Sequence, residues 1–121
     1  MTDLIERLEA ATEGSRELDA LIHATTLSLG RDYWPDERGR VVEYTGLRKI
    51  LHRAPHYTTS IDAALTLVPE GWGWSVNDDS EACLTLPGNG FLSDRGDIEL
   101  YGRSATPAIA LCIAALRARG S

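Results

Sequence analysis

The segment that follows Thr106 constrains the fold of this 121-residue chain more than any other. Thr106 is a good helix-capping residue, and Pro107 suits the first helical position, where its missing N–H costs nothing. Every residue from 109 to 116 is apolar, so the helix expected here has no polar face. Such a helix is covered by protein on more than one side, and we expect it to pack on a sheet with other helices beside it. The side chains predicted to be buried in this way are Ile109, Leu111, Cys112, Ile113 and Leu116.

Three short strands are expected before this helix. Trp72, Trp74 and Val76 alternate with small residues, which is the two-residue period of a half-buried strand. Residues 82–86 and 98–101 form the next two, and turn-forming residues separate all three. Short turns between successive strands indicate an antiparallel meander. The predicted fold class is therefore an α/β (α+β) sandwich, in which helices pack on an antiparallel sheet of three to four strands.

Trp72 and Trp74 lie on the same face of the first of these strands. We predict that both indoles belong to the core, because helices must cover one face of the sheet. The alternative is that they form an aromatic platform for the rings of a ligand. The exposure of the two indoles separates these interpretations.

Two helices are expected at the start of the chain and one in its middle. Apolar residues at helical spacing run through residues 4–11 and 18–29, with Gly14 between the two helices. Hydroxyl residues at 58–60 can cap the third helix, which ends at Pro69. These helices have polar faces, so we expect each to pack on one side only.

The stretch from residue 31 to residue 56 has a weaker pattern. Residues 33–39 are interpreted as a connection and residues 41–44 as a short strand. Residues 47–52 are interpreted as a short helix that ends before Pro55.

The length predicts a single domain over residues 1–121. With 43% hydrophobic and 25% charged residues, the composition is that of globular proteins. No apolar run of the signal-peptide kind follows the N-terminus, and the longest apolar stretch, residues 108–116, is too short to span a bilayer. Cys83 and Cys112 stand among apolar neighbours, which favours reduced core cysteines over a disulfide. We therefore expect a cytoplasmic protein without a membrane partner.

The net charge of −6 is unevenly distributed along the chain. Residues 38–56 contain five Arg or Lys against one Glu, a balance of +4, and residues 102–121 have a balance of +3. Residues 1–37 sum to −6 and residues 57–101 to −7. An acidic chain repels nucleic acid over most of its surface, so nucleic acid is not an expected partner. The basic segment is interpreted as a solvated loop, too small to be a nucleic-acid patch. Whether the protein forms a homo-oligomer stays open.

The sequence contains no catalytic, cofactor or metal-binding signature. It has no Gly-x-Ser-x-Gly, no Gly-x-Gly-x-x-Gly and no Walker loop. His52 and His56 have one-turn helical spacing, but Pro55 between them disfavours a helix, and His23 has no acid or cysteine at ligand spacing. We therefore predict no enzyme activity, no cofactor and no metal.

Three runs of the sequence resemble one family of proteins. They are residues 4–19, residues 57–76 with the string Tyr-Thr-Thr-Ser-Ile-Asp-Ala-Ala-Leu, and residues 105–116. Together they resemble the phage α-β-α sandwich domain proteins, which are small proteins of proteobacterial phages and prophages. The resemblance implies a sandwich fold, a phage origin and a location in the cytoplasm of the host bacterium. It implies no particular activity and carries over no catalytic residues.

The best candidate for a binding site joins the basic segment to the helix that follows it. The N–H groups at a helix start can bind an anion, and phosphate recognition uses hydroxyl and guanidinium groups. An aromatic ring nearby would stack on an attached base. Helix capping fully explains the hydroxyls without a ligand, and Asp62 in the first turn opposes an anion. The predicted ligand-binding residues are Arg48, Arg53, His56, Tyr57, Thr58, Thr59, Ser60 and Trp72.

The function expected from these observations is that of a non-enzymatic phage accessory protein. Its partner would be a host protein or a small anionic, nucleotide-like ligand, and its binding would blunt a host defence. Two alternatives stay open. One is a small enzyme that acts on a phosphorylated or acylated metabolite, and the other is a structural or assembly component of the virion.

Overall fold

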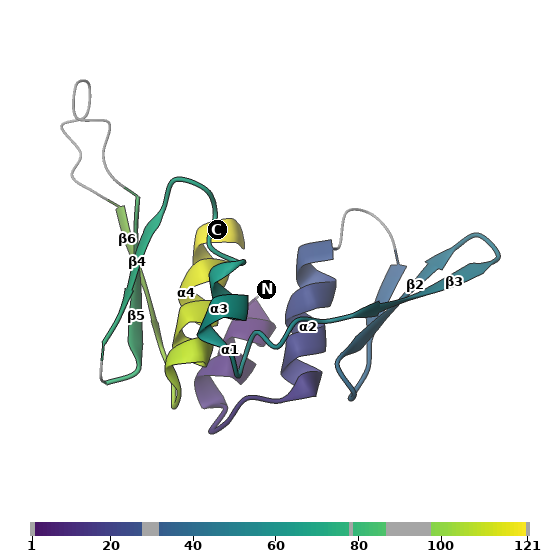
Figure 1. Ribbon diagram of the computed structural model, residues 1–121, viewed down its shortest axis with the longest axis horizontal. Coiled ribbons are helices and arrows are strands. Elements are labelled where there is room, and N and C mark those ends of the chain that lie inside the picture. The colour runs from purple at the N-terminus through teal and green to yellow at the C-terminus, as the bar shows by residue number, and fades with distance from the viewer. Residues whose placement is uncertain (1, 28–31, 78, 87–97, 121) are drawn as a thin grey trace.

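The computed structural model describes residues 2–27, 32–77, 79–86 and 98–120 of the chain. Within these residues it contains four helices and two separate three-stranded antiparallel sheets, ordered β1-β2-β3 and β4-β5-β6 (Figure 1). In chain order the elements are α1 (Thr2–Ala10), α2 (Arg16–Leu27), β1 (Asp32–Pro35), β2 (Arg40–Thr45), β3 (Arg48–Arg53), α3 (Ile61–Leu65), β4 (Gly73–Val76), β5 (Glu81–Leu86), β6 (Ile98–Arg103) and α4 (Pro107–Gly120).

The helices lie between the two sheets. Figure 1 shows α1, α3 and α4 gathered on one face of the sheet β4-β5-β6, with α2 standing between this group and the sheet β1-β2-β3. The fold is therefore α+β, with helices packed on an antiparallel sheet, as the sequence predicts. The sequence analysis anticipates the sheet next to α4, whereas the other sheet comes from the stretch with the weaker pattern.

The centre of the core is α4. Residues 109–116 have no solvent exposure, which confirms the predicted burial of this helix. Ala82 and Leu84 of β5 are fully buried beneath it, and α1 and α3 cover its other sides. Gly102 of β6 permits the close approach of helix and sheet, because a Cβ there would lie only 2.1 Å from the Ala110 carbonyl oxygen.

Residues 48–53 form the strand β3, so the prediction of a helix at residues 47–52 is wrong. Gly46 lies in the tight turn between β2 and β3 with a φ of +62°, a left-handed conformation that suits a hairpin. Once the hairpin forms, Ile50 pairs with Glu43 and the backbone groups of β3 bond across the sheet. A run of six residues is too short for its apolar spacing to separate a helix from a strand.

The other expected elements are present with shifted bounds. The connection predicted at residues 33–39 begins as strand β1, and the strand predicted at residues 41–44 is confirmed within β2. The helix predicted to reach Pro69 is shorter, because α3 ends at Leu65 and tight turns follow it. No helix in the described part of the chain is long and apolar enough to cross a membrane.

Two residues predicted to belong to the core are less buried than expected. Trp72 packs against the core, but Trp74 is 48% exposed, so the core prediction is wrong for Trp74. Trp74 shares a face with the buried Leu84, yet it lies on the edge strand β4, while α4 packs mainly on β5 and β6. Cys83 is half-buried because it points to the opposite face of β5, whereas Cys112 is buried in α4 as predicted.

Candidate functional site

The hydroxyl groups predicted to bind an anion serve the fold. Thr58 is 1% exposed, and the fully buried Asp19 of α2 accepts hydrogen bonds from its backbone N–H (2.8 Å) and from its hydroxyl (2.7 Å). Ser60 caps α3, because its hydroxyl accepts a hydrogen bond from the Ala63 N–H. Thr59 is the exposed member of the group. The segment therefore joins α2 to α3, and its hydroxyls need no ligand to explain them.

The other residues of the predicted site are dispersed. Tyr57 is buried in the core, and Trp72 is half-buried against the same core. Arg48 and Arg53 lie at opposite ends of β3, roughly 16 Å apart at the usual rise of a strand. Arg53 and His56 are the members of the predicted set that the structure brings to one cavity.

This cavity has a volume of about 480 Å³, and we call it the arginine pocket. It lies where the first turn of α2 meets one end of the sheet β1-β2-β3 and the segment before α3. Arg40 and Arg53 pair across β2 and β3, which places both at this end of the sheet. Among the described residues, those that line it include no carboxylate. The lining residues are Arg16, Arg38, Arg40, Arg53 and His56.

Arg16 is fixed by hydrogen bonds from its guanidinium group. It donates to the Asp19 carboxylate (2.7 Å) and to the Ala54 carbonyl (2.7 Å), with longer bonds of 3.4 Å to the carbonyls of Gly39 and Pro55. Gly39 has a φ of +80°, and a Cβ there would lie 2.3 Å from the Arg16 Nε. A side chain at residue 39 would therefore displace Arg16 from the wall of the pocket.

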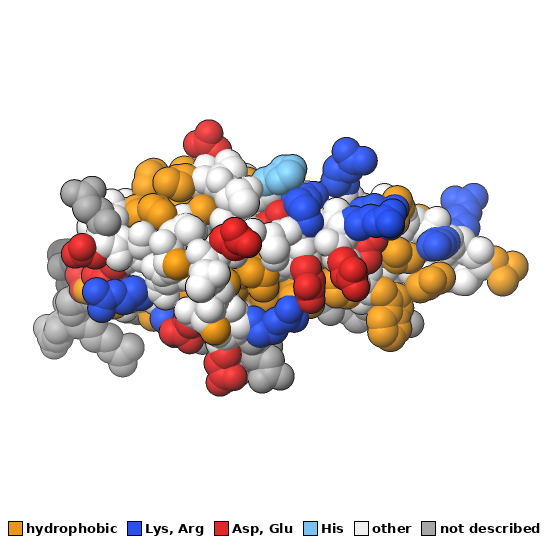
Figure 2. Space-filling view, turned by 90° about the horizontal axis from the view of Figure 1, so that it is seen from below, with side chains coloured by type: hydrophobic (Ala, Val, Ile, Leu, Met, Phe, Trp, Pro, Cys, Tyr) orange, Lys and Arg blue, Asp and Glu red, His pale blue; other side chains and the backbone are white. Residues whose placement is uncertain are grey.

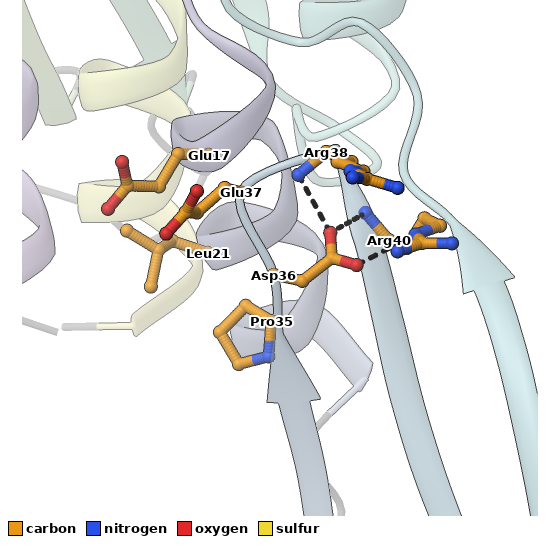
Figure 3. A pocket seen from close by; sticks show the side chains of 7 residues that line it. All are labelled: Glu17, Leu21, Pro35, Asp36, Glu37, Arg38 and Arg40. Carbon is orange, nitrogen blue, oxygen red and sulfur yellow. Dashed lines mark hydrogen bonds and ion pairs between the residues drawn. The ribbon is translucent and has the colours of Figure 1, made fainter.

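Arg40 is positioned by Asp36 in the turn between β1 and β2 (Figure 3). The Arg40 Nε donates to the Asp36 carboxylate at 2.7 Å, and that carboxylate also accepts the backbone N–H groups of Arg38 (2.9 Å) and Arg40 (2.8 Å). Partial burial raises the pKa of Asp36, but these hydrogen bonds and the charge of Arg40 outweigh it and leave the pKa below its usual value. Asp36 therefore stays ionised and orients Arg40.

A second cavity, of about 350 Å³, shares Arg38 and Arg40 with the arginine pocket (Figure 3). Its lining also contains Asp36, Glu17 and Glu37, so carboxylates outnumber guanidinium groups there by three to two. Figure 3 shows Glu17 and Glu37 together on the side away from the two arginines. The balance of charge therefore favours an anion in the arginine pocket rather than in this second cavity.

Two guanidinium groups of the arginine pocket have no protein partner in the described part of the chain. The side chains of Arg38 and Arg53 are exposed, and no described carboxylate pairs with either. His56 is exposed beside them. A guanidinium presents a planar fork of donors that matches the oxygens of a phosphate or a carboxylate. Two guanidinium groups of the pocket are thus available to a ligand, and the protein already holds the other two in place.

A cluster of polar aromatic residues lies between α2 and the inner face of the sheet β1-β2-β3. The His52 Nε2 is 2.8 Å from the Glu43 carboxylate, which is 4% exposed, and the rings of His23 and His52 are 6.4 Å apart. The His23 Nδ1 is 3.2 Å from the Tyr57 hydroxyl. Burial lowers the pKa of His23, and the nearby His52 lowers it further. In the described residues no three side chains are placed to hold a metal ion.

Sequence reasoning missed three of the five residues of the arginine pocket. Arg38 and Arg40 belong to the basic segment 38–56, so its charge balance was the available signal. Arg16 gave no signal for the pocket, because the bonds that bring it to the sheet reach residues more than twenty positions away along the chain.

Comparison with protein families, with curated proteins and with solved structures finds no match for this chain. The resemblance to phage sandwich proteins therefore stays a prediction, and the function is argued from the geometry of the site.

Proposed function

We propose that this protein is a non-enzymatic binding module whose ligand is a small phosphate-bearing anion held in the arginine pocket. One observation carries the proposal: four guanidinium groups and an imidazole converge on one cavity. Like charges so close together repel one another unless a counter-charge is present. Asp19 and Asp36 supply it for Arg16 and Arg40, whereas Arg38 and Arg53 are left for the ligand.

The resemblance to phage proteins supports a narrower form of the proposal. A nucleotide made as a signal by a host defence carries the phosphate that the pocket fits, and its capture would blunt that defence. An enzyme that acts on a phosphorylated metabolite is less well supported. Among the described residues that line the pocket, His56 is the one acid–base group, and the Glu43–His52 pair lies on the inner face of the sheet instead, so the pocket holds no acid–base pair.

Calorimetric titration with inorganic pyrophosphate tests the pocket directly. We expect binding that Arg53→Ala weakens about 10- to 150-fold, because a hydrogen bond to a charged group contributes about 1.5–3 kcal/mol. Arg48→Ala is the matched control, since it removes the same charge from the other end of β3. Its affinity should stay within about twofold of the parent, apart from the screened long-range effect of one charge.

Two results would contradict the proposal. One is the absence of heat up to millimolar pyrophosphate. The other is an equal loss of affinity in Arg48→Ala and Arg53→Ala, which would mean that net charge rather than the pocket binds the anion.

A further inference from the structure

The outer face of the sheet β1-β2-β3 points away from α2 and carries large apolar side chains. Side chains alternate between the two faces of a strand. Val41 and Glu43 of β2 are buried toward α2, so Val42 and Tyr44 point outward. The strand register places Trp34 and Leu51 on either side of Val42, on the same outer face. Trp34 is 60%, Leu51 55% and Tyr44 51% exposed.

Cations flank these side chains at both ends of the face. Arg53 and Arg40 pair next to the row of Trp34, Val42 and Leu51, and they also line the arginine pocket. Beyond that row Tyr44 pairs with Lys49 on one side and with Asp32 on the other. Figure 2 shows basic and apolar side chains interleaved over the end of the molecule that β1-β2-β3 forms. We call Trp34, Tyr44, Lys49, Leu51 and Arg53 the outer platform.

The charge of the platform decides what can cover it. Two copies stacked face to face would bring Lys49 and Arg53 of one against the same cations of the other, which opposes self-association. The carboxylates of an acidic protein would pair with the cations, but they would not stack on the exposed aromatic rings. Single-stranded nucleic acid satisfies both, because its phosphates pair with cations while its bases stack on aromatic side chains.

We propose that the outer platform binds single-stranded nucleic acid. Trp34 and Tyr44 are diagonal neighbours on adjacent strands, roughly 7–8 Å apart, so one base can lie on each ring. Arg53 and Lys49 receive the backbone phosphates, and the arginine pocket takes the phosphate at the end of the row. The inference rests on the proposed function, because the pocket opens at one end of the platform, and it names the ligand class of that site.

The acidic remainder of the chain is compatible with this proposal. The interaction of exposed charges fades over about 8–10 Å at physiological ionic strength. Residues 32–56, which provide most of the platform and the pocket, hold five Arg or Lys against four Asp or Glu, and one of these acids, Glu43, is buried on the opposite face of the sheet. The expectation that nucleic acid is not a partner treated the basic segment 38–56 as a solvated loop, whereas the structure folds it into a sheet that places its cations beside exposed rings.

Fluorescence anisotropy of the full chain with labelled 12-nucleotide oligouridylate and oligothymidylate tests the platform. We expect Trp34→Ala to weaken binding about 5- to 150-fold, which is the range for loss of one stacked base. Trp74→Ala is the matched control, because Trp74 is 48% exposed on the other sheet. Trp34→Phe should keep most of the affinity, since it keeps an aromatic ring. The two oligonucleotides show whether RNA or DNA is preferred.

Pyrophosphate titration of the same variants separates the two proposals. Trp34→Ala should leave pyrophosphate affinity unchanged within about twofold, because the indole does not line the pocket. If pyrophosphate binds but Trp34→Ala and Trp74→Ala bind oligonucleotides equally well, the proposal for the outer platform is contradicted. The proposal for the arginine pocket is then still supported. Displacement of the oligonucleotides by polyglutamate at equal charge would also overturn the platform. If neither probe binds, the proposed function itself fails.

Discussion

Asp19 lies fully buried in the first turn of α2 and receives hydrogen bonds from Arg16 and from Thr58. Arg16 reaches toward the sheet β1-β2-β3, and Thr58 belongs to the segment that leads to α3. One carboxylate therefore connects the wall of the arginine pocket to the helical core. Both of its oxygens are used, Oδ2 by Arg16 and Oδ1 by Thr58.

Asp19→Ala is expected to lower the free energy of unfolding by about 3–5 kcal/mol, because it leaves buried donors and a guanidinium without their partner. Glu17→Ala is the control in the same turn, since it removes only the exposed pair with Arg7 and should cost less than about 1 kcal/mol. Urea denaturation of both variants measures the difference. Equal, small changes would show that Asp19 is not the connection described here.

His23 makes the stability of the protein depend on pH. Burial and the nearby His52 lower the pKa of His23 below 6.5 in the folded state, so the unfolded state binds a proton more readily. The free energy of unfolding therefore falls as the pH drops from about 7 through the unfolded pKa toward the lower folded pKa. His23→Gln should show a shallower fall in denaturation curves taken across this range. A parental slope in His23→Gln would contradict the assignment.

At the scale of elements, the contact between α4 and β6 depends on a position without a side chain. A Cβ on Gly102 would meet the Ala110 carbonyl oxygen at 2.1 Å and the Ala114 nitrogen at 2.7 Å, and both atoms belong to the helix backbone. A Cβ on Gly73, in the edge strand β4, would have its nearest neighbour at 3.8 Å, an ordinary contact. The two glycines therefore differ in what they permit.

Gly102→Ala is expected to destabilise the protein by at least about 2 kcal/mol, because overpacking forces the helix off the sheet. Gly73→Ala should change the free energy of unfolding by less than about 1 kcal/mol. Leu111→Ala is the reference for the same helix, because truncating a buried leucine should lower the free energy of unfolding by about 2–5 kcal/mol. Chemical denaturation compares the three variants. A Gly102→Ala protein as stable as Gly73→Ala would mean that α4 does not press on β6 as closely as described.

The elements that the sequence predicts well are those whose pattern is long or strongly capped. The apolar run of α4 and its Thr106 cap predicted both the helix and its burial. β3 was mistaken for a helix, because six residues show too little of either period and the hairpin turn at Gly46 was not recognised. That one error also hid the pairing of Arg40 with Arg53, which builds the candidate site.

At the scale of the whole molecule, the two sheets have different surroundings. One is packed against the hydrophobic core that α4 dominates, and the other is covered on its inner face mainly by α2. The second sheet carries four of the twelve Arg and Lys residues of the chain, together with exposed Trp34 and Tyr44. This division of roles leads us to place the stability of the protein in one half and its binding surface in the other.

The measurement that tests the central claim most directly is a nuclear magnetic resonance titration of the labelled protein with pyrophosphate, following the backbone amide signals. The arginine pocket predicts that the signals of Arg38, Arg53 and His56 move together with one dissociation constant. Signals from β5 and α4 should stay in place, because these elements lie in the other half of the molecule. Movement confined to Thr59 and Ser60, or no movement at all, would contradict the claim.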